Sequence, residues 1–305
     1  MIPMLNRQAP HQLLMIRPGG FDFNAQTVAS NSFQKTADPD ARALALSEFD
    51  RVIEKLDQHD VAVHVFEDTV GTPDALFLNN WFSTHASGEV VLYPMLAANR
   101  RVERRSDLVA WLEANYQVSR VVDFSGYEQQ GSFLEGTGSL VLDHVNQVAY
   151  ANRSPRTSPE LVEAWCRHLN FTSCLFSALD AHHQPIYHTN VVMWIGERVA
   201  VVCLDAIPEH DQEQVISTLG ARHRLVSISF EQMAAFAGNV LEITSRKGDR
   251  YFLMSETALQ SLVPGQVNEL TKHADLLTVS IPTIEQVGGG GIRCMVAGNH
   301  LPARI

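Results

Sequence analysis

The sequence predicts an α/β fold built as a closed ring of five repeats. Short stretches rich in valine and isoleucine alternate with longer segments whose apolar residues recur at helical spacing, which is typical of α/β proteins. One hairpin-like pattern also recurs at intervals of 50 to 56 residues. The last repeat is truncated, so we expect the N-terminal strand at 13–17 to complete it and close the ring.

Each predicted element follows from its local pattern. Short apolar runs bounded by glycine, asparagine or aspartate predict strands at 13–16, 61–66, 90–93 and 191–195. Helical periodicity predicts helices at 41–58, 106–116, 158–169 and 210–219. The third helix carries Ser158 as its N-cap and Pro159 in its first turn, a combination that favours a helix start.

The five repeats share one plan: a polar or glycine-rich start, an apolar strand, a tight turn and a second apolar strand. They begin at Asn79, Glu135, His188, Gly238 and Gly289. Because equivalent positions in a ring face its axis, a carboxylate, an imidazole and a thiol are expected to meet at one centre. The alternative is a chance alignment of ordinary hairpins.

Composition narrows the classes of function. The net charge of −11 argues against nucleic acid, and the densest basic cluster, Arg100-Arg101 with Arg104-Arg105, is local. Four cysteines are too few for a disulfide scaffold and indicate reduced thiols. The N-terminus lacks a signal-peptide pattern, and no apolar run approaches the ~20 residues of a membrane span. We therefore expect one cytoplasmic catalytic domain over residues 1–305.

Cys294 is the candidate nucleophile. It follows the run Gly288 to Gly291, whose backbone freedom suits a tight turn or a close approach to a ligand. A phosphate-binding loop is the competing interpretation, but no lysine followed by serine or threonine is present. A thiol at this position can attack a substrate if its thiolate is stabilised. The other cysteines (Cys166, Cys174 and Cys203) are expected to be buried core residues.

His188 and Glu135 are the candidate acid–base groups. His188 can exchange protons with a thiol or a leaving amine, and Asn190 follows it on the same face of a predicted strand. Glu135 lies among apolar residues and glycines, where a charge needs a partner. A core ion pair and a catalytic carboxylate both satisfy that need. A zinc site with His182, His183 and His188 lacks ligand spacing, so no metal is expected.

Glu135-Gly136, His188-x-Asn190 and a glycine-rich loop before a C-terminal Cys294 together resemble the motif set of the pentein superfamily, whose members modify guanidines. The resemblance spans the chain and implies a five-bladed α/β propeller of ββαβ repeats with pseudo-fivefold symmetry. It implies that Cys294 attacks the guanidino-type carbon, that His188 acts as acid and base, and that Glu135 assists. It implies no metal or organic cofactor. It also implies that Arg156, or less favourably Arg153, binds a substrate α-carboxylate.

Two positions depart from the arginine deiminases, which have aspartates where this chain has Asn80 and Asn190. Amides suit a neutral ureido group, whose carbonyl oxygen needs a hydrogen-bond donor. The chain therefore resembles the citrulline-utilisation hydrolases (citrulline ureidases) more closely. This branch implies substrate binding by Asn79 and by an early polar loop, which the alternative treats as an ordinary surface loop. The loop residues in question are Phe21, Asn24 and Gln26.

The expected function is a cysteine hydrolase that cleaves a C–N bond of a ureido or guanidino amino acid, with citrulline as the expected substrate. An arginine or dimethylarginine deiminase-type hydrolase and an amidinotransferase are the alternatives within the superfamily. A ribosome anti-association factor of the same fold is a remote third. The expected partner is a small amino acid, with no nucleic acid or membrane, and a homodimer is left open.

Overall fold

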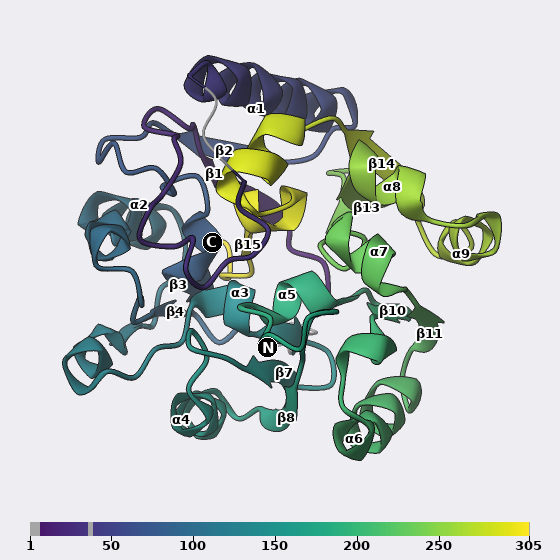
Figure 1. The fold of residues 1–305 in the computed structure, drawn as a ribbon. Helices are drawn as coiled ribbons and strands as arrows, with labels where there is room; N and C mark the ends of the chain where they lie inside the picture. Colours follow the sequence, from purple (N-terminus) through teal and green to yellow (C-terminus); the bar gives the residue numbers. More distant parts are fainter. Residues whose placement is uncertain (1–6, 36–38, 305) are drawn as a thin grey trace.

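A computed structural model describes residues 7–35 and 39–304 of the chain. The described residues form a ring of five three-stranded sheets, seen along its axis in Figure 1. In each sheet the first two strands are antiparallel, and the middle strand pairs in parallel with the third. The predicted fivefold α/β propeller is therefore confirmed.

Four sheets are continuous in sequence. They are β3 (Phe82–Thr84), β4 (Glu89–Leu92) and β5 (Arg120–Asp123); β6 (Val141–Asp143), β7 (Val148–Arg153) and β8 (Thr172–Ser177); β9 (Met193–Ile195), β10 (Val199–Val202) and β11 (Arg224–Ser227); and β12 (Leu241–Thr244), β13 (Arg250–Ser255) and β14 (Asp275–Val279).

The fifth sheet joins the two ends of the chain. Its middle strand β1 (Gln12–Ile16) pairs antiparallel with β15 (Ala297–Asn299) and parallel with β2 (Val63–Phe66). Leu13 lies opposite Gly298 on one side and Val63 on the other. The predicted closure of the ring by the N-terminal strand is thus confirmed.

Helices cover the outside of the ring (Figure 1). The predicted helices are present as α1 (Ala41–Gln58), α2 (Ser106–Asn115), α4 (Pro159–Leu169) and α6 (Glu209–Gly220). Three short helices were not predicted, because five to seven residues give too little helical periodicity: α7 (Phe230–Ala234), α8 (Glu256–Ser261) and α9 (Pro264–Leu270).

The starts of the repeats differ from the prediction. In four repeats the polar residues stand in a short helical turn before the first strand, or at its N-cap as Glu135 and His188 do, and not on that strand. The turns are η1 (Leu78–Asn80), α3 (Gly136–Ser139), α5 (Thr189–Val192) and η6 (Ile292–Met295). The strand predicted at 191–195 therefore begins only at Met193. Around the axis α3 packs against both η1 and α5, and this tertiary packing overrides the β-propensity of Val191 and Val192.

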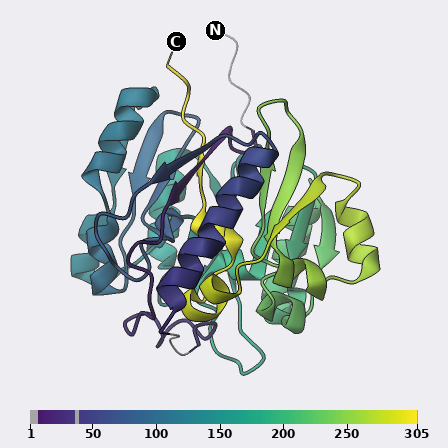
Figure 2. The same ribbon diagram turned by 90° about the horizontal axis from the view of Figure 1, so that it is seen from above.

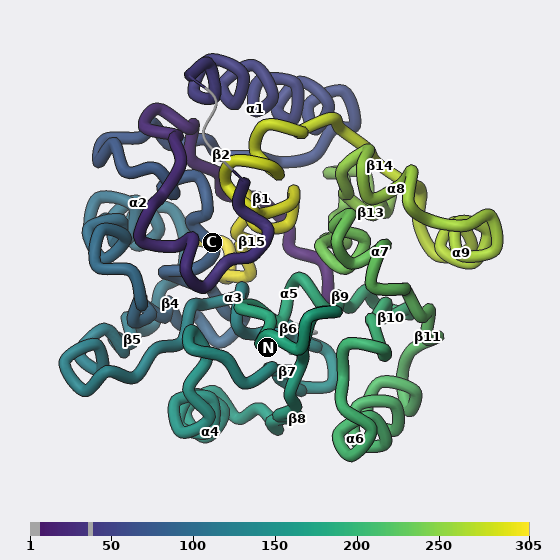
Figure 3. Tube along the Cα trace, viewed as in Figure 1, coloured from purple at the N-terminus to yellow at the C-terminus, as the bar shows by residue number. Residues whose placement is uncertain are grey.

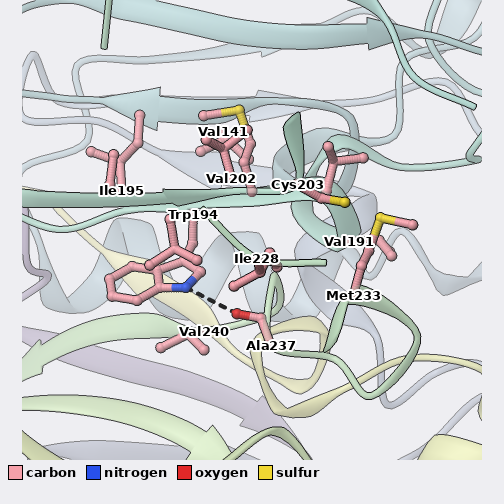
Figure 4. Close-up of a cluster of buried hydrophobic side chains, with 14 of the residues drawn as sticks. Val141, Val191, Trp194, Ile195, Val202, Cys203, Ile228, Met233, Ala237 and Val240 are labelled. Atoms are coloured by element: carbon pink, nitrogen blue, oxygen red, sulfur yellow. Dashed lines mark hydrogen bonds between the residues drawn. The ribbon is translucent and has the colours of Figure 1, made fainter. Parts of the chain in front are cut away.

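The largest core cluster lies between the second, third and fourth sheets. Figure 4 shows part of it, in which Trp194 packs among aliphatic side chains. The indole nitrogen of Trp194 donates to the carbonyl oxygen of Ala237 at 3.1 Å, so the one polar atom of this side chain is satisfied. The core is therefore shared between sheets.

The N-terminal loop (residues 17–35) crosses the front of the ring centre, as the trace in Figure 3 shows. The side view in Figure 2 places the two described chain ends on the opposite face. The axis thus has a loop face and a terminal face. Within residues 7–35 and 39–304, no helix is long and apolar enough to cross a membrane.

Ring closure can be tested at β1. Leu14 is fully buried there, and we expect Leu14→Ala to lower the free energy of unfolding by about 3 kcal/mol through lost burial and the cavity left behind. Leu44→Ala, on the exposed side of α1, is expected to change it by less than about 0.5 kcal/mol. Urea unfolding of both variants makes the comparison; equal effects would contradict the central position of β1.

Candidate active site

Cys294 lies at the axis within η6 and is only 4% exposed. Its Sγ lies 3.3 Å from the amide nitrogen of Asn239 and 3.6 Å from that of Asn190. The orientation of Asn239 is fixed, because its Nδ2 also donates to the Asn190 carbonyl and its Oδ1 accepts from the Arg293 backbone N–H. Two amide donors therefore converge on the thiol.

The glycine run before Cys294 is required by crowding. Gly289 has φ of 66°, a left-handed conformation that favours glycine. A Cβ on Gly290 would stand 3.0 Å from the Phe77 ring and 3.2 Å from the Cβ of Cys294. The Tyr187 hydroxyl holds the run from outside by donating to the Gly289 carbonyl at 2.7 Å. These contacts fix the position of the thiol.

His188 and Glu135 form a buried pair, 2% and 0% exposed. Nε2 of His188 lies 2.9 Å from Oε2 of Glu135. A carboxylate only accepts, so Nε2 carries the proton and Nδ1 is left as the basic nitrogen. Glu135 also accepts from the Leu96 backbone N–H and from Arg156. The predicted carboxylate–imidazole contact is present.

Burial determines the resting charges of the site. It lowers the pKa of His188 to about 4, although the Glu135 charge opposes the shift. Burial also raises the pKa of the Cys294 thiol, and hydrogen bonding to Asn239 and the Arg293 charge offset only part of this rise. For Glu135, burial is outweighed by Arg156 and His188, so its pKa lies well below the usual range. At neutral pH the site therefore holds a thiol, a neutral imidazole and a carboxylate.

Asn80 presents an amide donor to this site. Its Oδ1 accepts from Arg100 Nη1 at 2.9 Å, which fixes the orientation of the amide, because a guanidinium cannot accept. Its Nδ2 is buried and has no hydrogen-bond partner among the described residues. A Cβ on Gly138 would lie 2.6 Å from this nitrogen and 2.7 Å from Nδ1 of His188. Gly138 thus lets the amide and the imidazole share one small space.

Sequence reasoning missed two residues of the site, Arg100 and Asp74. Arg100 is buried and paired with Glu103 at 2.8 Å, with Asp74 at 3.7 Å. It belongs to the basic cluster set aside as local, and only the fold shows that it points inward. Asp74 was missed because a single polar residue near a strand carries no signal of its own. Asn239, at the start of the fourth repeat, was expected near the axis from the equivalence of the repeat starts, but its contact with the thiol was not predicted.

Arg156 connects the site to the N-terminal loop. Its guanidinium donates to Glu135, to the Thr27 carbonyl and to the Ser30 hydroxyl, and stacks on Tyr187 with 5.0 Å to the ring centroid. These contacts give Arg156 protein partners, so its predicted binding of a substrate carboxylate stays a prediction that requires displacing Ser30. Arg153 is exposed, and its nearest acidic partner is Asp211 at 3.6 Å.

The remaining predicted binding residues lie near the site without contacting the thiol. Asn24 is buried and donates to Asp74 at 2.8 Å. Gln26 is exposed, and its side chain accepts from the Asn99 backbone. Asn79 donates to Thr137, and Phe21 packs in the cluster behind Gly288. Their predicted roles in binding stay predictions.

The other three cysteines are core thiols, and among the described residues the histidines of the alternative zinc site lie apart from any ligand cluster. Burial raises the pKa of Cys166 to about 12 and of both Cys174 and Cys203 to about 11, as expected of core thiols. His182 and His183 are exposed on a loop. In the part of the chain that the structure describes, no group of three or more histidine, cysteine or acidic side chains could hold a metal ion.

The sequence was compared with known protein families and with proteins of curated function. The family profile described as N,N-dimethylarginine dimethylhydrolase, eukaryotic, matches residues 17–301. No protein of curated function matches the sequence.

Solved structures share the fold at low identity. The N-terminal domain of ArgZ, an arginine dihydrolase from the ornithine–ammonia cycle in Cyanobacteria, superposes with a TM-score of 0.76 at 15% identity, covering 95% of this chain and 99% of that one. AgrE in complex with L-arginine gives 0.77 at 17%, with 96% of this chain on 40% of AgrE. A dimethylarginine dimethylaminohydrolase adduct gives 0.65 at 14%, covering 94% and 99%.

The absence of a side chain at Gly138 can be tested by substitution. We expect Gly138→Ala to reduce turnover by at least about 100-fold, since its methyl group would displace the Asn80 donor and His188. Gly126→Ala is the matched control, because a Cβ there meets nothing within 4 Å. Steady-state kinetics and thermal unfolding separate the two effects. Unchanged turnover in a folded Gly138→Ala variant would contradict the assigned geometry.

The neutral His188 predicts acid sensitivity. Its folded pKa of about 4 lies below the unfolded value of 6.5, so protonation favours the unfolded chain as pH falls through this window. Stability is fully present above pH 6.5 and is lost by up to about 1.4 kcal/mol per pH unit below it. Urea unfolding between pH 6.5 and 5.0 should give a shallower decline for His188→Gln, and equal slopes would refute the assignment.

Proposed function

The chain belongs to the N,N-dimethylarginine dimethylhydrolase family of the pentein superfamily, and from this premise we propose that it is a cysteine hydrolase that converts citrulline to ornithine, ammonia and carbon dioxide. At the coarser level it is a hydrolase of the guanidino-modifying type, acting on a non-peptide C–N bond of a small amino acid. The choice of a ureido substrate rests on the side chains of this site.

The observation that carries the proposal is the amide of Asn80. Its buried Nδ2 has no acceptor within residues 7–35 and 39–304, and Arg100 prevents the amide from turning its oxygen inward. A buried donor without a partner costs about 1–3 kcal/mol, which a ligand carbonyl oxygen would recover. A ureido group offers such an oxygen, whereas a guanidinium offers only donors. The site therefore favours a neutral ureido group over a cation.

The resting charges specify the first step. The Cys294 thiol transfers its proton to Nδ1 of His188 as Sγ attacks the ureido carbon, so that neither of these two groups carries a buried charge beforehand. Asn80 donates to the oxygen on which negative charge develops. Glu135 stabilises the imidazolium that forms, through its contact with Nε2. The reaction depends on His188 throughout, because a neutral substrate supplies no charge to lower the thiol pKa.

The second step releases ornithine and then inorganic carbon. His188 returns its proton to the departing side-chain amine as the C–N bond breaks, leaving a carbamoyl group on Sγ. Water adds to this thioester-like carbon and releases carbamic acid, which decomposes to ammonia and carbon dioxide. One water is consumed per citrulline, and the thiol is regenerated.

Asp74 is our candidate anchor for the α-ammonium group. One of its oxygens accepts from Asn24, and the other is buried with no hydrogen-bond partner among the described residues. The carboxylate is 3% exposed and lies beneath the N-terminal loop, which Asn24 and Thr27 attach to it. A cationic group of the substrate would satisfy that oxygen.

The same unpartnered oxygen supports a second candidate substrate. A guanidinium could pair with Asp74, and both ArgZ and AgrE are described with arginine as substrate or ligand. An arginine hydrolase of the deiminase or dihydrolase type is therefore the alternative function. It leaves the Asn80 donor without an acceptor, which is why we place it second.

Product analysis decides between the two. We expect ornithine and ammonia from citrulline with wild-type protein, and none with Cys294→Ala. Asn80→Asp should lower kcat/KM for citrulline by roughly 100- to 1,000-fold, because a donor to the developing oxyanion becomes a repelling carboxylate. The same change should lower kcat/KM for arginine far less.

Asn268→Asp, on an exposed turn of α9, is the matched control for added negative charge. It should leave both activities within about twofold. Citrulline released from arginine, with no ornithine formed from citrulline, would overturn the ureidase proposal and favour the alternative.

A further inference from the structure

A polar cavity lies along the ring axis on the far side of Cys294 from the N-terminal loop. It has a volume of about 50 Å³, room for a few water molecules. Its polar lining comes from several repeats and from the N-terminal segment: Gln8, Ser83, Thr84, Thr137, His144, Asn190, Arg293 and His300. The side view in Figure 2 shows that the described chain ends lie on this face.

Arg293 brings an unneutralised charge to this cavity. Burial lowers the pKa of its guanidinium, but only to about 10, so the group is charged at neutral pH. Nη1 donates to the Val296 carbonyl at 2.7 Å. No carboxylate of the described residues forms an ion pair with it, in contrast to the buried Arg100 and Arg156. The residue is half-buried, so water reaches part of it, but a partly desolvated cation without a counter-ion still favours an anion.

The surroundings reinforce that preference. The chain carries a net charge of −11, yet among the residues that the structure describes no aspartate or glutamate lines the cavity. His144 and His300 stack with 4.1 Å between ring centroids, and burial keeps the pKa of His144 at about 4 and that of His300 well below its usual value. Neutral imidazoles offer N–H donors without charge. The site therefore presents one positive charge and neutral hydrogen-bonding groups.

The cavity is linked to the reaction centre and to the surface. Asn190 lines it and also contacts Sγ of Cys294, while Arg293 directly precedes Cys294 in η6. On the outer side, His144 and His300 also line a second pocket of about 70 Å³ that Arg7 borders. These two histidines therefore line both spaces, and Arg293 and Arg7 bring a cationic side chain to each.

We propose that this axial cavity is a binding site for a small inorganic anion of single charge, held by Arg293. A planar oxyanion suits the guanidinium best, because two of its oxygens match the fork of N–H donors. Bicarbonate, the hydrated form of the released carbon dioxide, has this shape and charge, and this identification rests on the proposed function. The cavity then accepts inorganic carbon behind the nucleophile.

Bromide tests the anion site without reference to turnover. Crystals of wild-type protein soaked in sodium bromide should show an anomalous peak at the bromine edge beside the Arg293 guanidinium. Arg293→Met crystals should show none there, and Arg293→Lys should retain it. Water alone in the wild-type cavity would overturn the proposal, as would a peak that persists in Arg293→Met.

Thermal unfolding provides a second readout. Bromide or bicarbonate should raise the wild-type unfolding midpoint by roughly 2 °C at ten times the dissociation constant, relative to gluconate of equal ionic strength. Arg293→Met should show no such rise, and in gluconate it should unfold no lower than wild type, because it removes an unpaired charge. Arg224→Met, which loses an exposed ion pair with Glu269, should retain the full rise. An equal rise in Arg293→Met would refute the site.

Bicarbonate itself separates the two proposals. If both hold, it should inhibit ornithine formation in wild type and more weakly in Arg293→Lys, whose point charge lacks the planar fork. If bromide binds but citrulline is not hydrolysed, the anion site stands and its assignment to bicarbonate fails. Ornithine formation with no bromide site would leave the ureidase intact and remove the cavity from its mechanism.

Discussion

The buried carboxylate of Glu135 is the interaction on which the site depends. Completely excluded from solvent, it accepts hydrogen bonds from His188, from Arg156 and from the backbone of Leu96. Each partner stands on a different part of the ring. Burying a carboxylate costs desolvation free energy, and this cost is offset only when donors satisfy its oxygen atoms in this way. The same bonds fix the tautomer of His188 and attach the N-terminal loop through Arg156.

Of the described arginine side chains around this carboxylate, some are paired with an acidic side chain and one is not. Arg100 and Arg156 each face an acidic side chain, whereas Arg293 faces a polar cavity that no acidic side chain of the described residues lines. The thiol and imidazole between them rest neutral because burial disfavours both charged forms. The site is thus preorganised for charge that develops during reaction, with amide donors in place of carboxylates at Asn80 and Asn190.

The repeat pattern predicted more of the fold than local propensity did. Hairpin spacing placed all five sheets and the closing role of β1, because a sheet edge left open at the last repeat must be paired. Local propensity failed at the axis, where a strand was expected at Val191 and Val192 and a helical turn is found. Crowding of several turns around one axis is a tertiary effect that a short window of sequence cannot report.

By itself, the sequence determined the α/β ring, the candidate thiol and its acid–base partners, since repeat equivalence brings Glu135, His188 and Cys294 to one axis. Tertiary structure decided which groups face them. It turned Arg100 inward to orient Asn80, brought Asn239 to the thiol, and committed Arg156 to Glu135 and the loop. The reason is physical: hydrogen-bond partners and buried charges are set by side-chain direction and packing, which spacing along the chain does not specify.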